Sequence, residues 1–426
     1  MSAPSFLKHP TRATPARRLA LQITAQVRKR NAFAHKLIES KVRHADIPQN
    51  ERDFATLLIL GVVATYGELD YLIDRALPKG TIKADVRDAL RISTYELFFL
   101  NKEVPVVVDQ GVELVRSLVP GAAGFANKVL HETAKLIPEF PFGDPSSDPQ
   151  ALAHQQAFPL WLTERLITDL GYDKAKLFME ASNQQAPIFI VDLQQGTTLK
   201  IVSAQLKDYI PRIEAGEMIV ADASTQSVTD YATPSSDGPY LEVGSGRGTK
   251  TILLLKNAQR MHQFKPQLYA VDIHAFKHDI LKQRARAYGL DNVTTILGDA
   301  TRLDTLATAS ILPESFDGAL IDAPCSGTGT MRRHPEIRWR LTPKTVTTLA
   351  QQGLAMLSSA SSHIKKGGFI VYSTCSALHE ENECVLENFL ASENGKGFSV
   401  IEPPFCSSLS PGSPDVHFAT KLVRQR

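Results

Sequence analysis

Hydrophobic positions recur every three or four residues from about residue 13 to residue 137. The pattern is clear in "ARRLALQITAQV", "ERDFATLLILGVVATYGELDYLIDRAL" and "DVRDALRISTYELFFL". This spacing places apolar side chains on one face of a helix. Pro and Gly in "LPKGT" and "LVPGAAG" mark helix ends. We therefore predict an all-helical N-terminal domain over residues 1–140.

The pattern changes twice after this domain. Residues 141–159 ("PFGDPSSDPQALAHQQAFP") are rich in Pro and Ser, which predicts a linker. Residues 160–221 then contain two short helical segments, followed by the short apolar runs "APIFIVDL", "TLKIVS" and "GEMIVAD" around a further helix. These runs have the length and composition of strands, so we expect a small α/β subdomain.

Residues 222–426 show the strongest alternation of strands and helices. Five apolar runs, "YLEVG", "LYAVDI", "TTILGD", "GALIDAP" and "GFIVYSTC", are separated by helical segments. Such alternation is typical of a parallel sheet wrapped by crossover helices. The predicted fold is therefore multidomain: an all-α domain, a small α/β subdomain, and a doubly wound, Rossmann-like α/β domain.

Composition narrows the class of protein. A chain of 426 residues is too long for one ordinary core, and 43% hydrophobic with 22% charged residues is typical of a folded soluble protein. No run of about eighteen apolar residues predicts a membrane span, and the first residues lack the apolar segment of a secretory signal. Four cysteines without a CxxC pair favour neither a disulfide framework nor a zinc site. We expect a cytoplasmic, metal-free monomer with reduced thiols.

The basic residues are concentrated at the front of the chain. Residues 1–140 carry 20 Lys or Arg against 15 Asp or Glu, whereas the remainder carries 27 against 30. A basic surface attracts nucleic-acid phosphates without regard to sequence. A solvated helix face would give the same pattern.

Ligands of a doubly wound sheet bind beyond the carboxyl ends of its strands. The first strand there ends in "LEVGSGRGTKT", in which alternating glycines let the backbone approach a ligand. Asp272 ends the next strand, where an acid holds ribose hydroxyls. Asp299 ends a third strand and could accept from an adenine amino group, although it could equally be a helix N-cap. The predicted cofactor contacts are Glu242, Gly244, Ser245, Gly246, Arg247, Gly248, Thr249, Lys250, Asp272, Asp299 and Asp322.

The ligand predicted here is a nucleoside without a diphosphate. No third glycine is spaced for a pyrophosphate, and no GxxxxGK[ST] motif occurs. S-adenosylmethionine is such a nucleoside, and we predict it as the cofactor.

Two cysteines follow the fourth and fifth strands, in "LIDAPCSGTG" and "IVYSTCS". Taken singly, Cys325 and Cys375 are ordinary core thiols. Together with Asp322, at matching ends of neighbouring strands, they suit one reaction. A thiolate that adds to carbon 6 of cytosine makes carbon 5 nucleophilic toward a methyl donor. Asp322 would handle the proton at ring nitrogen 3, and the second cysteine would assist release.

Several segments identify a family. "IDAPCSGTG", "RRHPEIRW", "KKGGFIVYSTCS" and "HEENE" closely resemble the RNA cytosine-5 methyltransferases of the Sun/Fmu type, which modify bacterial 16S ribosomal RNA. "RDFATLLILGVV" and "GAAGFANKVLHE" resemble the NusB-like RNA-binding domain that this type carries. The resemblance implies a class I methyltransferase with RNA as its partner. It also implies that Cys375 is the nucleophile, that Cys325 serves product release, and that Asp272, Asp299 and Asp322 line the pocket.

The chain departs from the family at the first strand. The family has an aspartate followed by "CAAPGGKT", whereas this chain has Glu242 and "GSGRGTKT". Two alternatives therefore stay open: a transfer-RNA cytosine-5 methyltransferase, and a catalytically inactive RNA-binding assembly factor.

The segment "MRRHPEIRWR" follows the first cysteine loop directly. Basic residues around Trp339 suit RNA phosphates and base stacking, although a solvated helix start with an inward Trp would look the same. Glu380, Glu381 and Glu383 are interpreted as acids in the first turn of a helix. The predicted RNA contacts are Arg332, Arg333, His334 and Arg338.

Overall fold

The computed structural model describes residues 9–77, 80–407, 410 and 412–425. The chain forms two compact units, which we describe separately. The helical unit comprises the described residues up to Asn183 together with Met331–Arg340, and the sheet unit comprises Gln184–Thr330 and the described residues from Leu341 onward. Of the predicted turn "LPKGT", Pro78 and Lys79 lie outside the described residues.

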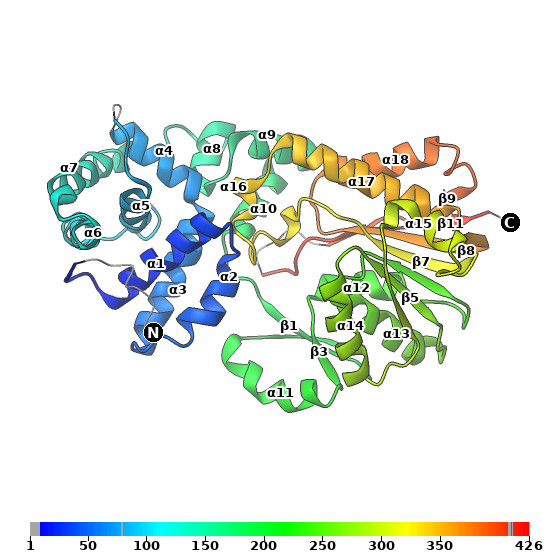
Figure 1. Ribbon diagram of the computed structural model, residues 1–426. Helices are drawn as coiled ribbons and strands as arrows, with labels where there is room; N and C mark the ends of the chain where they lie inside the picture. Colours follow the sequence, from blue (N-terminus) through cyan, green and yellow to red (C-terminus); the bar gives the residue numbers. More distant parts are fainter. Residues whose placement is uncertain (1–8, 78–79, 408–409, 411, 426) are drawn as a thin grey trace. The chain divides into compact units, whose positions relative to one another are not determined.

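The helical unit confirms the predicted all-α domain (Figure 1). Helix α5 runs through its core, where Ala89, Leu90 and Ile92 are completely buried. The other helices pack their apolar stripes around it. The elements are α1 (Pro15–Arg30), α2 (Ala34–Leu37), the π-helical η1 (Ile38–Val42), α3 (Gln49–Ala64), α4 (Tyr66–Ala76), α5 (Ala84–Phe98), α6 (Val104–Leu118), η2 (Pro120–Ala122), α7 (Ala123–Ala134) and η3 (Ile137–Glu139).

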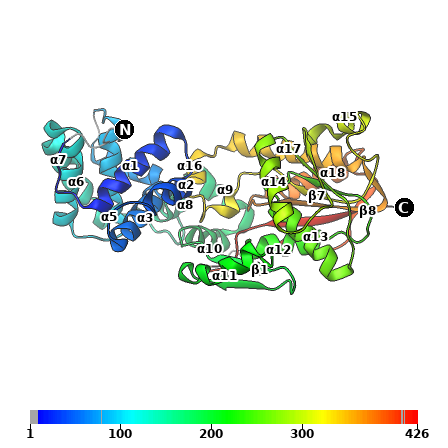
Figure 2. The same cartoon turned by 60° about the horizontal axis from the view of Figure 1, so that its bottom comes forward.

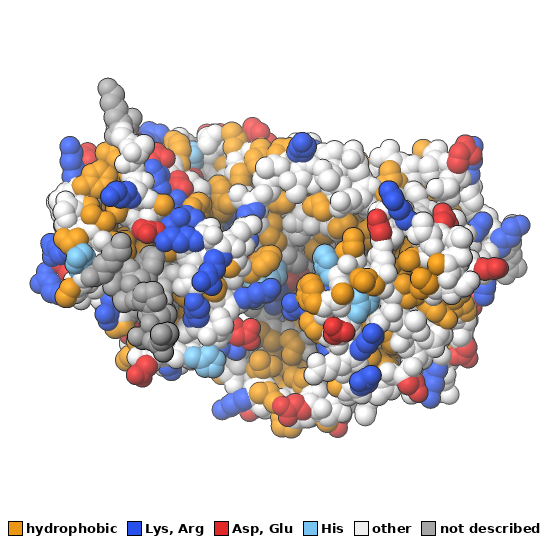
Figure 3. Space-filling model, viewed as in Figure 1, with side chains coloured by type: hydrophobic (Ala, Val, Ile, Leu, Met, Phe, Trp, Pro, Cys, Tyr) orange, Lys and Arg blue, Asp and Glu red, His pale blue; other side chains and the backbone are white. Residues whose placement is uncertain are grey.

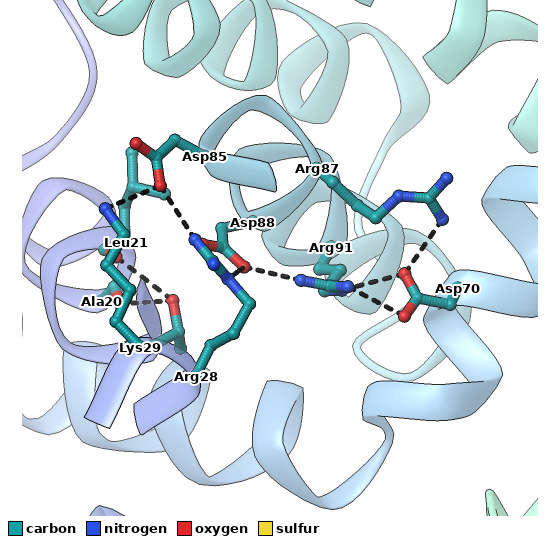
Figure 4. A network of polar contacts seen from close by, with 10 residues as sticks. Ala20, Leu21, Arg28, Lys29, Asp70, Asp85, Arg87, Asp88 and Arg91 are labelled. Carbon is teal, nitrogen blue, oxygen red and sulfur yellow. Dashed lines mark hydrogen bonds and ion pairs between the residues drawn. The ribbon is translucent and has the colours of Figure 1, made fainter. Parts of the chain in front are cut away.

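An ion-pair network ties three of these helices together (Figure 4). Arg28 of α1 lies 2.7 Å from Asp88 of α5, which also accepts a bond of 2.6 Å from Arg91. Arg91 in turn reaches Asp70 of α4 at 2.8 Å. Buried charges are retained only where they are paired in this way. Part of the basic surplus at the front of the chain therefore stabilises the domain rather than facing a partner.

The segment predicted as a linker, residues 141–159, is instead folded. It contains α8 (Pro149–Gln156), whose first turn is capped by Asp148 through the Gln150 N–H at 2.9 Å. His154 is buried and its Nδ1 lies 2.9 Å from Glu68 of α4. The Pro and Ser residues of this segment therefore mark helix caps and turns in a folded region. Helices α9 (Leu160–Leu170) and α10 (Tyr172–Ser182) also belong to the helical unit, which moves the boundary from residue 140 to residue 183.

The sheet unit begins with the expected small α/β piece. Its antiparallel sheet has the order β2-β1-β3, formed by β1 (Ile188–Asp192), β2 (Thr198–Ile201) and β3 (Met218–Val220). Helix α11 (Leu206–Glu214) packs on this sheet, as both ribbon views show (Figure 2).

The main sheet has the strand order β10-β11-β8-β7-β4-β5-β6, and β9 pairs with β11. Strands β4 to β8 are the five predicted parallel strands. One face is covered by α15, α17 and α18, and the other by α12, α13 and α14, which confirms the doubly wound fold (Figure 1). The elements are α12 (Ala223–Tyr231), β4 (Tyr240–Val243), α13 (Thr249–His262), β5 (Leu268–Asp272), α14 (Ala275–Ala287), β6 (Val293–Leu297), α15 (Leu303–Thr308), β7 (Phe316–Asp322), α17 (Pro343–Ser361), β8 (Ile364–Thr374) and α18 (Glu383–Ala391).

The sheet is mixed rather than purely parallel, which corrects the sequence prediction. Strands β9 (Phe398–Val400), β10 (Phe405–Cys406) and β11 (Phe418–Arg424) add three antiparallel pairings beside β8. Antiparallel neighbours need no crossover helix. The strand-helix alternation that revealed the parallel strands was therefore absent here.

Within the described residues, no single helix is long and apolar enough to cross a membrane. Helices α3 and α4, bent by 77° at their junction, meet the criterion of length and composition only as a pair.

Candidate active site

The parallel strands of the main sheet end at one level. Val243 pairs with Val271 on one side and with Ile321 on the other, and Ile321 pairs with Tyr372. The loops that follow β4, β5, β7 and β8 therefore meet at one edge. These loops carry the glycines, Asp272, Asp322 and both predicted cysteines.

The glycine loop after β4 depends on the absence of side chains. Gly244, Gly246 and Gly248 all have positive φ values, of 79°, 58° and 84°. A Cβ on Gly244 would lie 2.4 Å from the backbone oxygen of Asp322, and one on Gly248 would lie 2.2 Å from Leu281. Only glycine fits there.

Asp272 is nearly buried at the end of β5 and anchors the glycine loop. Its carboxylate accepts hydrogen bonds from Gly246 N–H at 3.0 Å, from His274 N–H at 2.9 Å and from Lys277 Nζ at 3.1 Å. Burial opposes ionisation, but these donors outweigh it, and the pKa of Asp272 lies below its ordinary value. An ionised acceptor thus stands where the sequence predicted one.

Asp322 and Lys250 form an ion pair above the end of β7. Lys250 Nζ lies 2.7 Å from Asp322 Oδ2. Burial alone would lower the pKa of Lys250, but Asp322 outweighs burial and raises it. Lys250 is therefore a cation at neutral pH, and it holds the carboxylate beside the cysteine loop.

Glu242, in β4, is enclosed by the protein. It has no exposed surface, and its Oε2 accepts a hydrogen bond of 2.5 Å from Thr251. Burial raises the pKa of Glu242 to about 8. Its second oxygen, Oε1, is buried without a hydrogen-bond partner, and the contact of Glu242 with a cofactor stays a prediction.

The remaining predicted cofactor residues have varied settings. Asp299 is exposed and caps a short turn by accepting the Thr301 N–H at 2.9 Å, which is the alternative role considered for it. Ser245 is buried, and its hydroxyl has no hydrogen-bond partner. Arg247 and Thr249 both accept bonds from Arg284, the first through its carbonyl and the second through its hydroxyl. Their contacts with a cofactor stay a prediction.

The two cysteines are in contact. Cys325 Sγ lies 3.1 Å from Cys375 Sγ and 3.3 Å from the Cys375 amide N–H, which donates to it. The contact with Cys375, together with burial, raises the pKa of Cys325 well above its ordinary value. Cys325 is therefore a protonated thiol beside its neighbour.

The segment Met331–Arg340 belongs to the helical unit, and it corrects the prediction for Arg338. Arg338 is completely buried, and its guanidinium donates to Asn183 Oδ1 at 2.8 Å and to the carbonyl of Ala157 at 3.3 Å. Burial lowers the pKa of Arg338 to about 9. Trp339 also points inward and donates to the carbonyl of Ala64 at 2.7 Å. Arg338 therefore has no exposed surface for an RNA contact, and Trp339 is half-buried.

Arg332, Arg333 and His334 are half-buried in the same segment. Burial and the neighbouring charges of His35, Arg333 and Lys36 lower the pKa of His334 to about 4. His35, His334 and Glu336 bring possible metal-ligating atoms within 4.8 Å of one another. The sequence could not show this cluster, since His35 lies 299 positions before His334. The same Arg333 and Lys36 that depress protonation of His334 also oppose a bound cation.

Sequence reasoning missed the role of Glu381. The sequence predicts an acid in the first turn of a helix, and Glu381 does lie in the short helical turn His379–Glu381, but its carboxylate also lies between the two cysteine loops and accepts from Ser326 and Ser376. Its place six residues after Cys375 was the only signal available.

A doubly wound sheet with a glycine loop, an acid after the second strand and reactive side chains at its carboxyl edge defines a Rossmann-like methyltransferase. Comparison with known proteins narrows the class. Residues 231–404 match the family described as 16S rRNA methyltransferase RsmB/F, and residues 14–135 match the NusB family. These matches confirm the resemblance predicted from the sequence: a segment similar to the NusB family precedes a segment similar to the RsmB/F methyltransferases.

Individual relatives cover most of the chain. A probable ribosomal RNA small subunit methyltransferase B of Synechocystis sp. is 28% identical over 410 residues, covering 88% of this chain and 89% of that protein. Ribosomal RNA small subunit methyltransferase B of Thermus thermophilus is 28% identical over 402 residues, 92% of each chain. The crystal structure of PH0851 has a TM-score of 0.73 at 19% identity, over 97% of this chain and 100% of that one, and shows the same fold.

Proposed function

We propose that this protein transfers a methyl group from S-adenosylmethionine to carbon 5 of a cytosine in 16S ribosomal RNA, through a covalent bond between Cys375 and carbon 6. The observation that carries the proposal is the pair of thiols 3.1 Å apart at the carboxyl edge of the sheet. They lie in the loops after β7 and β8, and the β7 loop begins at the Lys250–Asp322 ion pair.

The cofactor fits the residues present. The Ser245 hydroxyl is buried without a hydrogen-bond partner, and Gly244 packs too tightly on Asp322 for a side chain. Asp272, whose pKa is lowered by its hydrogen-bond donors, offers a carboxylate at the end of the next strand. The carboxylate suits the ribose hydroxyls of a nucleoside, and the glycine loop lets the protein backbone approach it closely. When bound, S-adenosylmethionine supplies an electrophilic methyl group.

The thiols and Asp322 account for the remaining chemistry. Addition of the Cys375 thiolate to carbon 6 moves an electron pair toward ring nitrogen 3, which takes up a proton from water, and the Asp322 carboxylate would hold that proton as a hydrogen-bond acceptor. Carbon 5 then carries the electron density that attacks the methyl group. After transfer, water takes the proton from carbon 5, the electron pair of that C–H bond re-forms the double bond between carbons 5 and 6, and the bond between carbon 6 and sulfur breaks, so that Cys375 leaves as a thiolate. Cys325, kept protonated beside Cys375, is placed to assist that release.

RNA as the partner is supported by the relatives and by basic residues of the helical unit. The named relatives are ribosomal RNA methyltransferases. On the face shown in Figure 3, Lys and Arg side chains gather where α1 and α2 lie in Figure 1. Arg332, Arg333 and His334 remain the proposed contacts from the segment after the first cysteine loop, and Arg338 does not. Such an enzyme acts where ribosomes are assembled, in the cytoplasm.

Substitution of the two cysteines tests the mechanism. Cys375→Ala should abolish methyl transfer, because it removes the thiol assigned to add to carbon 6. Cys325→Ala should instead accumulate a protein–RNA adduct that survives denaturation, because release is impaired. Tritiated methyl transfer and denaturing gels measure the two outcomes. Full activity of Cys375→Ala would show that the assigned mechanism is wrong.

Two further measurements separate the alternatives. Bisulfite sequencing of RNA from a deletion strain shows whether the lost 5-methylcytosine lies in ribosomal or transfer RNA. Calorimetric titration with S-adenosylmethionine tests the inactive assembly factor, for which no binding at millimolar cofactor is expected.

A further inference from the structure

Glu381 occupies the space between the two cysteine loops. It ends the short turn η7 (His379–Glu381) and is only 1% exposed. An ionised group is costly to bury unless several donors surround it. The hydrogen-bond donors around this carboxylate are therefore the evidence for its role.

Both cysteine loops donate to Glu381. Ser326, the residue after Cys325, gives its amide N–H to Oε1 at 2.6 Å and its hydroxyl to Oε2 at 2.5 Å. Ser376, the residue after Cys375, gives its hydroxyl to the same Oε2. One carboxylate thus bridges the immediate neighbours of both thiols.

Other contacts make the two loops a single block. Gly329 N–H donates to the carbonyl of Cys375 at 2.9 Å, and Ala377 N–H donates to the Thr328 hydroxyl at 2.9 Å. A Cβ on Gly329 would lie 2.2 Å from the carbonyl oxygen of Val416, so the loop has no room to shift in that direction. Glu381 is the one charged group that accepts from both sides of this described block.

The helix-dipole explanation does not account for this position. The donors to Glu381 come from loops 55 and 5 residues away, and none comes from the first turn of α18. Neighbouring Glu380 shows the contrast, because it points outward and accepts from Thr347 of α17 at 2.6 Å.

We propose that Glu381 is a positioning residue that fixes where Cys325 and Cys375 meet, an inference that rests on the proposed function of the same site. Glu381 acts by holding Ser326 and Ser376, and with them the sulfur atoms, in register. Displacement of a reacting atom by about 1 Å costs on the order of a hundredfold in rate.

The first test measures methyl transfer by Glu381→Ala and Glu381→Gln, with Glu380→Ala as the matched control. Glu381→Ala should lower kcat at least about tenfold while the KM for S-adenosylmethionine stays within about twofold, since Glu381 does not contact the cofactor loop. Glu381→Gln keeps an acceptor for the Ser326 N–H and should recover most of the loss. Glu380→Ala should behave as the unmodified protein.

The second test reads thiol geometry without methyl transfer. In a Cys384→Ser, Cys406→Ser background, only Cys325 and Cys375 remain. A diazenedicarboxamide oxidant accepts two hydrogens and becomes a hydrazine, while the two thiols become one disulfide. Closure is followed by the loss of both titratable thiols. We expect closure at least about fivefold slower in Glu381→Ala than in this background, because a disulfide demands close, oriented sulfur atoms.

The outcomes separate this proposal from the proposed function. If closure depends on Glu381 while the unsubstituted protein transfers no methyl group to cytosine, positioning stands and the proposed function fails. If Glu381→Ala keeps both the closure rate and kcat at an unchanged melting temperature, the positioning role is overturned. Should Glu381→Ala fail to fold, Glu381→Gln decides. A partial lowering of kcat and of the disulfide closure rate supports the proposal, and values equal to those of the unsubstituted protein overturn it.

Discussion

The buried carboxyl group of Glu242 makes the stability of the sheet unit depend on pH. Burial raises its pKa to about 8, whereas a glutamate in the unfolded chain titrates near 4.5. Between these values the folded protein holds a proton that the unfolded chain has lost. Stability therefore falls as pH rises through this window, by up to about 1.4 kcal/mol per pH unit.

Glu242→Gln should remove this dependence. A glutamine keeps an oxygen to accept from Thr251 and never ionises, so the variant should gain on the unsubstituted protein as pH rises. We expect the melting temperature of Glu242→Gln, relative to the unsubstituted protein, to be clearly higher at pH 8 than at pH 5.5. Thermal melts at both values measure this difference. An equal difference at the two pH values would mean that Glu242 is ionised in the folded state.

At the scale of residues, the sequence predicted which side chains stand at the ends of strands. Cys325, Cys375 and Asp322 each follow an apolar run, so the edge they share was visible from periodicity alone. Burial was not visible. Arg338 and Glu381 look like solvated charges in the sequence, and only the folded chain surrounds one with carbonyls and the other with hydroxyls.

At the scale of elements, the short helix α16 (Ile337–Arg340) is anchored in the helical unit by the buried side chain of Arg338. Its guanidinium lies 4.0 Å from the centre of the Phe158 ring and donates to groups at the ends of α8 and α10. Arg338→Met should therefore destabilise the helical unit by roughly 1–3 kcal/mol, because buried carbonyls lose their donor. Denaturant unfolding measures the change.

Arg333→Ala serves as the comparison for this helix. As a proposed phosphate contact, Arg333 should contribute to RNA affinity and to its salt dependence, so its loss should reduce the slope of affinity against salt by about one. Arg338→Met should leave that slope unchanged under conditions where the protein is folded. A reduced slope for Arg338→Met would place its side chain at the RNA after all.

Element prediction succeeded where one period dominated a segment. The helices up to residue 137 and the five parallel strands followed from spacing. It failed for α8, because Pro149 and Asp148 begin a helix with the same residues that mark a linker. It failed for β11, because an antiparallel strand needs no crossover helix, and so no alternation of strand and helix marks it in the sequence.

At the scale of the whole molecule, the chain leaves the sheet unit after Thr330 and returns at Leu341. The ten residues between them complete the helical unit. Arg340 donates to the carbonyl of Ala32 at 2.7 Å, and Glu336 accepts from the Ala34 N–H at 3.2 Å. Domain prediction from composition could not find this exchange, since it interrupts one unit to supply another.

This exchange predicts how proteolysis will differ between the full chain and a fragment of residues 184–426. In the full chain, Arg338 is buried against its partners in α8 and α10, and trypsin should cut after it slowly. In the fragment those partners are missing, so the segment should be open and cut at least about tenfold faster. Mass spectrometry of timed digests gives the two rates, and cofactor titration checks that the fragment remains folded. The fragment lacks every residue of the helical unit before position 184. If trypsin cut after Arg338 equally slowly in the folded fragment and in the full chain, the segment would be packed on the sheet unit instead.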